Sequence, residues 1–101
     1  MDPYRDPVVM TDAYDEMLTV EENIVNKAVQ IVKRGAPRPR VVRVSLDDFH
    51  DVGRRLFAKI ETSPYGEWIR IHTAVGQLDL VPSALLDRYR FEFHVQLTVS
   101  V

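Results

Sequence analysis

The last twelve residues of the chain, Arg90 to Val101, alternate strictly between apolar and polar side chains. A period of two is typical of a β-strand with one buried face, because successive side chains of a strand point to opposite sides. At about 3.3 Å per residue this strand would be roughly 40 Å long, about twice the usual length. We therefore expect its second half to lack a neighbour in its own chain and to pair with a second copy, giving a homodimer. The apolar residues of this dimer strand are Val95, Leu97, Val99 and Val101.

The composition is typical of a single soluble domain. With 101 residues, 46% of them hydrophobic and 28% charged, the chain is long enough to bury a core and too short for a second domain. The absence of cysteine excludes a disulfide framework and a catalytic thiolate, and favours a reducing compartment, so we expect a cytoplasmic protein. Short apolar runs and an acidic start lead us to expect neither a membrane span nor a secretory signal.

Charge is distributed unevenly along the chain. Residues 1–22 contain seven acidic residues against Arg5 alone, which gives this segment −6, whereas the remainder carries +4. We expect residues 1–18 to form an acidic arm before a single domain at 19–101. Acids and cations near helix ends are often explained by the helix dipole. A cluster of cations that can attract phosphate follows the acidic segment, and consists of Lys33, Arg34, Arg38, Arg40 and Arg43.

Two segments have the periodicity of amphipathic helices. The first begins with the capping-box spacing of Thr19 and Glu22 and ends at Gly35. An alternative start near Thr11 stays open, because apolar residues continue the stripe in that direction. The second predicted helix is capped by Ser45, and its apolar stripe continues through residue 60, with acids early and cations late.

The remaining pattern predicts strands at 40–44, 67–73 and 77–81, followed by two helical turns at 83–89 before the final strand. The order α-β-α-β-β-(short α)-β predicts an α+β fold with a four-stranded mixed, mostly antiparallel sheet and two main helices on one face. A right-handed crossover would make the first two strands parallel. After residue 40 this element order resembles that of ferredoxin-like folds, a resemblance that implies no particular activity.

The apolar faces of these elements define the expected core. We expect proline to end the strand before Pro82, because proline cannot donate to a ladder. The predicted core consists of Ile24, Ala28, Ile31, Phe49, Val52, Leu56, Ile60, Ile69, Ile71, Leu78, Leu80, Phe91, Phe93, Val95 and Leu97.

The polar face of the predicted sheet carries the residues best suited to binding a partner. Tryptophan and arginine dominate the energetics of protein interfaces, whereas an RNA-recognition sheet would need aromatic residues on its two central strands, which are absent. The pattern therefore favours a protein-binding or adaptor module. Its candidate binding residues are Trp68, Arg70, His72, Arg43, Arg90 and His94.

The sequence contains no catalytic or cofactor signature. No serine lies in a nucleophile elbow, and the four glycines are too dispersed for a phosphate-binding loop. His72, His94 and Glu92 would hold a metal only if their strands were neighbours, and their spacing indicates no such site. We expect a non-enzymatic protein without metal or cofactor. Two alternatives stay open: a nucleic-acid binder that uses the basic cluster, and an acidic inhibitor of a nucleic-acid-handling complex.

Overall fold

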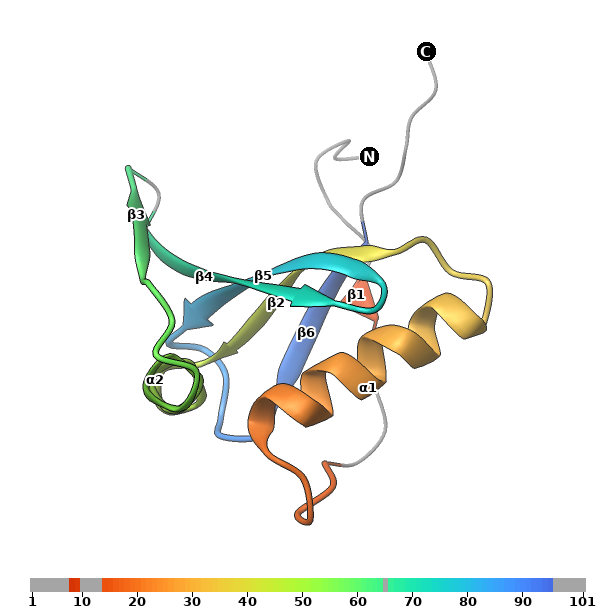
Figure 1. The fold of residues 1–101 in the computed structure, drawn as a ribbon, viewed down its shortest axis with the longest axis horizontal. Helices are drawn as coiled ribbons and strands as arrows, with labels where there is room; N and C mark the ends of the chain where they lie inside the picture. Colours follow the sequence, from red (N-terminus) through yellow and green to blue (C-terminus); the bar gives the residue numbers. More distant parts are fainter. Residues whose placement is uncertain (1–7, 10–13, 65, 96–101) are drawn as a thin grey trace.

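Two helices cover one face of an open sheet in the computed structural model, which describes residues 8–9, 14–64 and 66–95 (Figure 1). The elements in chain order are β1 (Val8–Val9), α1 (Val20–Lys33), β2 (Pro39–Ser45), α2 (Leu46–Arg55), β3 (Glu61–Ser63), β4 (Gly66–Thr73), β5 (Gly76–Ser83) and β6 (Phe91–Val95).

The sheet has the strand order β1-β6-β2-β5-β4-β3. Five of these strands have three residues or more, and the two-residue β1 lies at one edge. Only β2 and β5 pair in parallel among the described strands, and the other neighbours are antiparallel. The predicted α+β class with a mixed, mostly antiparallel sheet is confirmed, but the predicted number of four strands is wrong because it omits β3 and the two-residue β1.

The predicted parallel arrangement of the first two strands is also wrong. β3 runs in the direction of β2, as a crossover through α2 requires, but the chain reverses between Ser63 and Gly66. β4 is therefore antiparallel to β2, and the parallel neighbour of β2 is β5, with Val41 opposite Asp79. The short helix predicted at 83–89 is absent, since this segment forms turns. The element order thus departs from the ferredoxin-like arrangement.

The capping box predicted for α1 is confirmed. The side-chain oxygen of Thr19 accepts from the amide of Glu22 at 3.2 Å, and the Glu22 carboxylate accepts from the amide of Thr19 at 3.3 Å. Residues 14–19 are not helical, so the alternative start near Thr11 is wrong. The buried Asn23 accepts from the amide of Asp15 at 2.8 Å and donates to its carbonyl at 2.9 Å, which fixes the preceding loop against the helix.

Helix α2 begins at its predicted cap, Ser45, but ends at Arg55, five residues before the end of its apolar stripe. Phe57 then adopts a left-handed conformation with φ of 48°. The chain turns away from the helix axis, and the predictions that Leu56 and Ile60 are buried are wrong, because they are 44% and 41% exposed.

The core lies between the two helices and the inner face of the sheet. The remaining described members of the predicted core are confirmed as buried, from Ile24 on α1 to Phe93 on β6. The prediction omitted Val20, Val42 and Val44. The side chains of Val95 and Leu97 lie outside the part that the structure describes, as do residues 96–101 of the predicted dimer strand.

Strand β5 continues through Pro82 to Ser83, so the expectation that proline ends this strand is wrong. The ladder explains why proline is tolerated there. Even-numbered residues of β5 direct their backbone groups toward β4, and the last β4–β5 pair is Ile69 with Leu80. The missing N–H of Pro82 would therefore point beyond that ladder.

Candidate protein-binding surface

The face of the sheet opposite the helices is uncovered by any helix among the described residues (Figure 1). We call this surface the open face. The strand register aligns its side chains in rows that run across the strands. One row across β6, β2, β5 and β4 consists of His94, Val41, Asp79 and Arg70. The adjacent row consists of Glu92, Arg43 and Val81.

Trp68 and Arg70 form the most ordered part of the open face. The guanidinium carbon of Arg70 lies 4.8 Å from the centroid of the Trp68 ring. Arg70 Nε donates to Asp79 Oδ1 at 2.9 Å, and Nη2 donates to Oδ2 at 3.5 Å. The hydrogen bond and charge of Asp79 raise the pKa of Arg70 above its ordinary value. The guanidinium thus contacts the indole ring and has its charge balanced by a carboxylate.

The other predicted binding residues are spread over the sheet. His72 is exposed and follows Arg70 on the same face of β4. Arg43 lies two strands away, roughly 10 Å, and is opposite Glu92. His94 lies three strands from β4, and its Nε2 is enclosed without a hydrogen-bond partner among the described residues. Arg90 precedes β6 and does not belong to the rows.

The strand order also separates the histidines that sequence alone could have brought together. His72 and His94 are three strands apart, about 14 Å, so they cannot share one ion. Over residues 14–64 and 66–95, no group of three or more histidine and acidic side chains is placed to hold a metal.

The predicted basic cluster is divided among several elements. Lys33 ends α1 and Arg34 is its C-cap. Arg38 Nη1 donates to the carbonyl of Val75 at 3.1 Å in the β4–β5 turn. Its guanidinium leaves no room for a β carbon at Gly76, where φ is 107°. Arg38 therefore takes part in a contact within the fold. The cations of the basic cluster lie on several elements and do not form one continuous surface for a phosphate chain.

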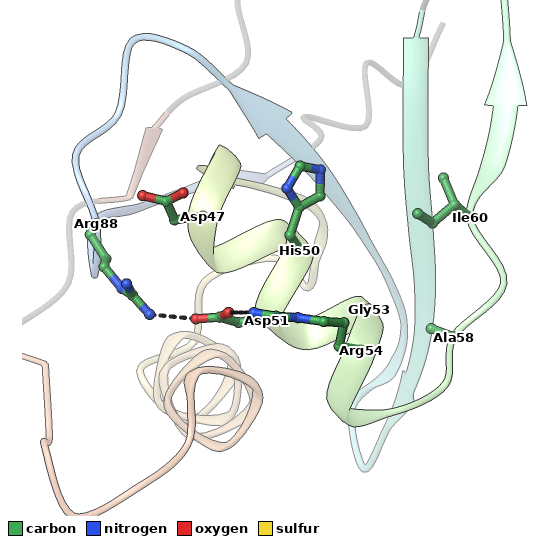
Figure 2. A pocket seen from close by; sticks show the side chains of 8 residues that line it. All are labelled: Asp47, His50, Asp51, Gly53, Arg54, Ala58, Ile60 and Arg88. Atoms are coloured by element: carbon green, nitrogen blue, oxygen red, sulfur yellow. Dashed lines mark hydrogen bonds and ion pairs between the residues drawn. The ribbon is translucent and has the colours of Figure 1, made fainter.

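A hollow of about 630 Å³ lies beside α2 (Figure 2). Asp51 accepts from Arg54 at 2.5 Å and also from Arg88, so both cations in the hollow are paired. The Arg88 pKa is raised by neighbouring Tyr89, with further contributions from Asp51 and other acids. His50 points away from the Arg88–Asp51 pair (Figure 2). The arrangement connects α2 to the 84–90 segment and provides no activated nucleophile.

The buried Asp48 completes this connection. Its Oδ2 accepts from the amide of Tyr89 at 2.7 Å, and its Oδ1 lies 3.7 Å from Arg88 Nε. One acid of the segment proposed for the inhibitor alternative also stabilises the fold: Glu21 pairs with Arg55 at 3.3 Å, which links the two helices.

One surface feature contradicts the sequence prediction, which placed Phe57 in the buried apolar stripe of the second helix. The side chain of Phe57 is 95% exposed although its backbone is left-handed. The amide of Phe57 donates to Arg54 and the amide of Ala58 donates to Gly53, which is the Schellman pattern at the end of a helix. Helix α1 ends in the same pattern, but there Gly35 occupies the left-handed position with φ of 84°. A non-glycine residue costs about 1–2 kcal/mol at such a position, and the exposed ring recovers little of this by burial.

No family model, curated protein or solved structure matches this chain. The described helices are too short and too polar to cross a membrane.

Proposed function

We propose that this chain is a small non-enzymatic binding or adaptor module that recognises another protein through the open face and acts as a homodimer. The observation that carries this proposal is the Trp68–Arg70 pair, which lies on the open face and is hydrogen-bonded to Asp79 through Arg70. Tryptophan and arginine are the residue types most enriched among interface hot spots, and fixed side chains lose little entropy on binding.

The charge pattern of the open face favours a polypeptide over a nucleic acid. Arg70 is paired with Asp79, and Arg43 lies opposite Glu92, so cations alternate with acids across the rows. Val41 and Val81 supply apolar surface between these charges. A phosphate chain requires several cations with uncompensated charge, whereas a mixed charged and apolar surface is typical of protein interfaces.

The homodimer is supported by the length of the final strand. The last described β2–β6 pair is Pro39 with Val95, and residues 96–101 continue the apolar and polar alternation of the sequence beyond it. The alternation of these six residues predicts a strand that needs a neighbour.

The proposal is tested by comparing two double variants in affinity capture from cell extract. Trp68→Ala with Arg70→Ala removes the ordered part of the open face, while Asn26→Ala with Gln30→Ala changes an exposed side of α1. We expect specific protein partners to be retained by wild type and the α1 variant and lost by the open-face variant. A hot-spot pair of this kind is worth about 2 kcal/mol or more, roughly a thirtyfold loss of affinity.

Circular dichroism establishes that both variants are folded. Identical proteins captured by both double variants would contradict recognition through the open face. Co-purified nucleic acid that is released at high salt would instead support the nucleic-acid alternative.

A further inference from the structure

Half of strand β4 has an open edge on the side of β3. β3 pairs with β4 only from Gly66 to Trp68, whereas β4 continues to Thr73. Thr73 and Gly76 close a two-residue turn, so this pair must exchange both of its backbone hydrogen bonds. Odd-numbered residues of β4 therefore bond to β5. Arg70 and His72 direct their N–H and C=O groups to the opposite side, where no described strand pairs with them.

A hollow of about 380 Å³ lies along this edge. If the β3 register continued, Lys59 would face Arg70 and Phe57 would face His72. The chain instead turns toward α2, and the hollow opens between Leu56, Ala58, Lys59 and Glu61 on one side and residues 70–72 on the other. The exposed Phe57 lies between Leu56 and Ala58 in the sequence. Its backbone is left-handed, a conformation that only glycine adopts without strain.

We propose that residues 96–101 of a second copy bind at this edge as an added strand. Their polar residues, Gln96, Thr98 and Ser100, would lie beside Arg70 and His72 on the open face. Their apolar residues, Leu97, Val99 and Val101, would lie on the inner side with Ile69 and Ile71, next to Leu56. The strand would satisfy the N–H and C=O groups of two residues that pair with no described strand, and would fill a hollow whose lining is part apolar and part charged.

The exchange is reciprocal, so that each chain donates its last residues and accepts those of its partner. Reciprocal exchange closes a two-fold dimer, whereas one-way exchange would produce open chains. This inference rests on the proposed homodimer and assigns its contact. It differs from direct pairing between the two final strands, which leaves the β4 edge vacant.

The first experiment uses light scattering during size-exclusion chromatography. His72→Pro removes one N–H at the open edge but keeps the hydrogen bonds of Ile71 and Thr73 to β5, and His72→Ala is the matched control because it retains the N–H. We expect wild type and His72→Ala to have twice the chain mass of 11.7 kDa. We expect His72→Pro to dissociate about tenfold more readily, as for one lost backbone hydrogen bond.

Mixing two variants separates the two modes of dimerisation. Leu97→Asp impairs the donated segment, and His72→Pro impairs the acceptor edge. A mixture of the two retains one intact donor and one intact acceptor, so dimers should partly return under reciprocal exchange. Direct pairing of the two final strands would leave His72→Pro fully dimeric and would overturn the exchange while retaining the homodimer. A monomeric wild type would overturn both.

Amide hydrogen exchange on wild type makes the test independent of variant folding. In a dimer formed by exchange, the amides of Arg70 and His72 are as protected as those of Ile69 and Ile71, and this protection falls on dilution. Rapid exchange at Arg70 and His72 in a wild-type dimer would overturn the proposal.

Discussion

The buried carboxylate of Asp48 should be a main connection between α2 and the 84–90 segment. Asp48 is completely buried, accepts from the Tyr89 amide at 2.7 Å and lies 3.7 Å from Arg88 Nε. A hydrogen bond to a charged group contributes about 1.5–3 kcal/mol. The Arg88 side chain is 48% exposed, so solvent reduces the ion pair to about 1 kcal/mol or less.

Replacing Asp48 by alanine removes both interactions. It also removes the desolvation cost of burying a charged carboxylate. Part of this cost is uncompensated in the wild type, because Oδ1 has no hydrogen-bond partner among the described residues. We therefore expect Asp48→Ala to lower the free energy of unfolding by about 2 kcal/mol. Asp48→Asn keeps an acceptor for the Tyr89 amide and loses only the charge, so we expect about 1 kcal/mol or less.

Urea and thermal unfolding followed by circular dichroism measure these changes. For a domain of this size, a loss of 2 kcal/mol corresponds to a fall in Tm of roughly 8–16 °C, with an unchanged urea m-value. Asp47→Ala is the matched control, since Asp47 is the exposed neighbour in the same helical turn. If Asp48→Ala were as stable as Asp47→Ala, the buried carboxylate would not stabilise the connection between α2 and the 84–90 segment.

Three further predictions concern one tyrosine and the two helix ends. Burial raises the pKa of Tyr14 above its ordinary value of 10.0, so the folded chain keeps a proton that the unfolded chain releases. The free energy of unfolding should therefore fall as pH rises above about 10. Tyr14→Phe should make the urea midpoint fall less steeply over this pH range. The same pH slope for Tyr14→Phe and wild type would contradict this prediction. Phe57→Gly should raise the free energy of unfolding by about 1 kcal/mol, because it relieves a left-handed residue that buries little surface, and a lower Tm would show that the ring packs in the monomer. Gly35→Ala should lower it by about 1 kcal/mol through backbone strain alone, since no atom lies within 4 Å of the added carbon; no change in the urea midpoint would refute this.

Local signals predicted the beginnings of both helices better than the end of α2. Thr19 and Ser45 are capping residues whose side chains accept amides three residues ahead, and both helices begin there. Leu56 and Ile60 continue the apolar period of α2, so the pattern gave no reason to end it at Arg55. The end depends on a left-handed conformation at Phe57, a residue type that carries no signal for it.

The sequence likewise predicted only part of the candidate surface. Alternation alone places Trp68, Arg70 and His72 on one face of a strand. The pairing of Arg70 with Asp79 depends on the β4–β5 register. The separation of His72 from His94 follows from a strand order that sequence periodicity does not encode. β3 escaped prediction because its three residues, Glu61–Ser63, lack an apolar alternation, and the open edge of β4 follows from how short β3 is.

Site-specific photo-crosslinking in cells tests recognition through the open face most directly. A photoreactive residue replaces Gln77, an exposed position on the open face opposite His72, or Asn26 on the exposed side of α1 as the control. We expect a protein adduct from position 77 that is absent from position 26 and is lost when Trp68→Ala is added. The same adducts from both positions, or an adduct with nucleic acid at position 77, would contradict it.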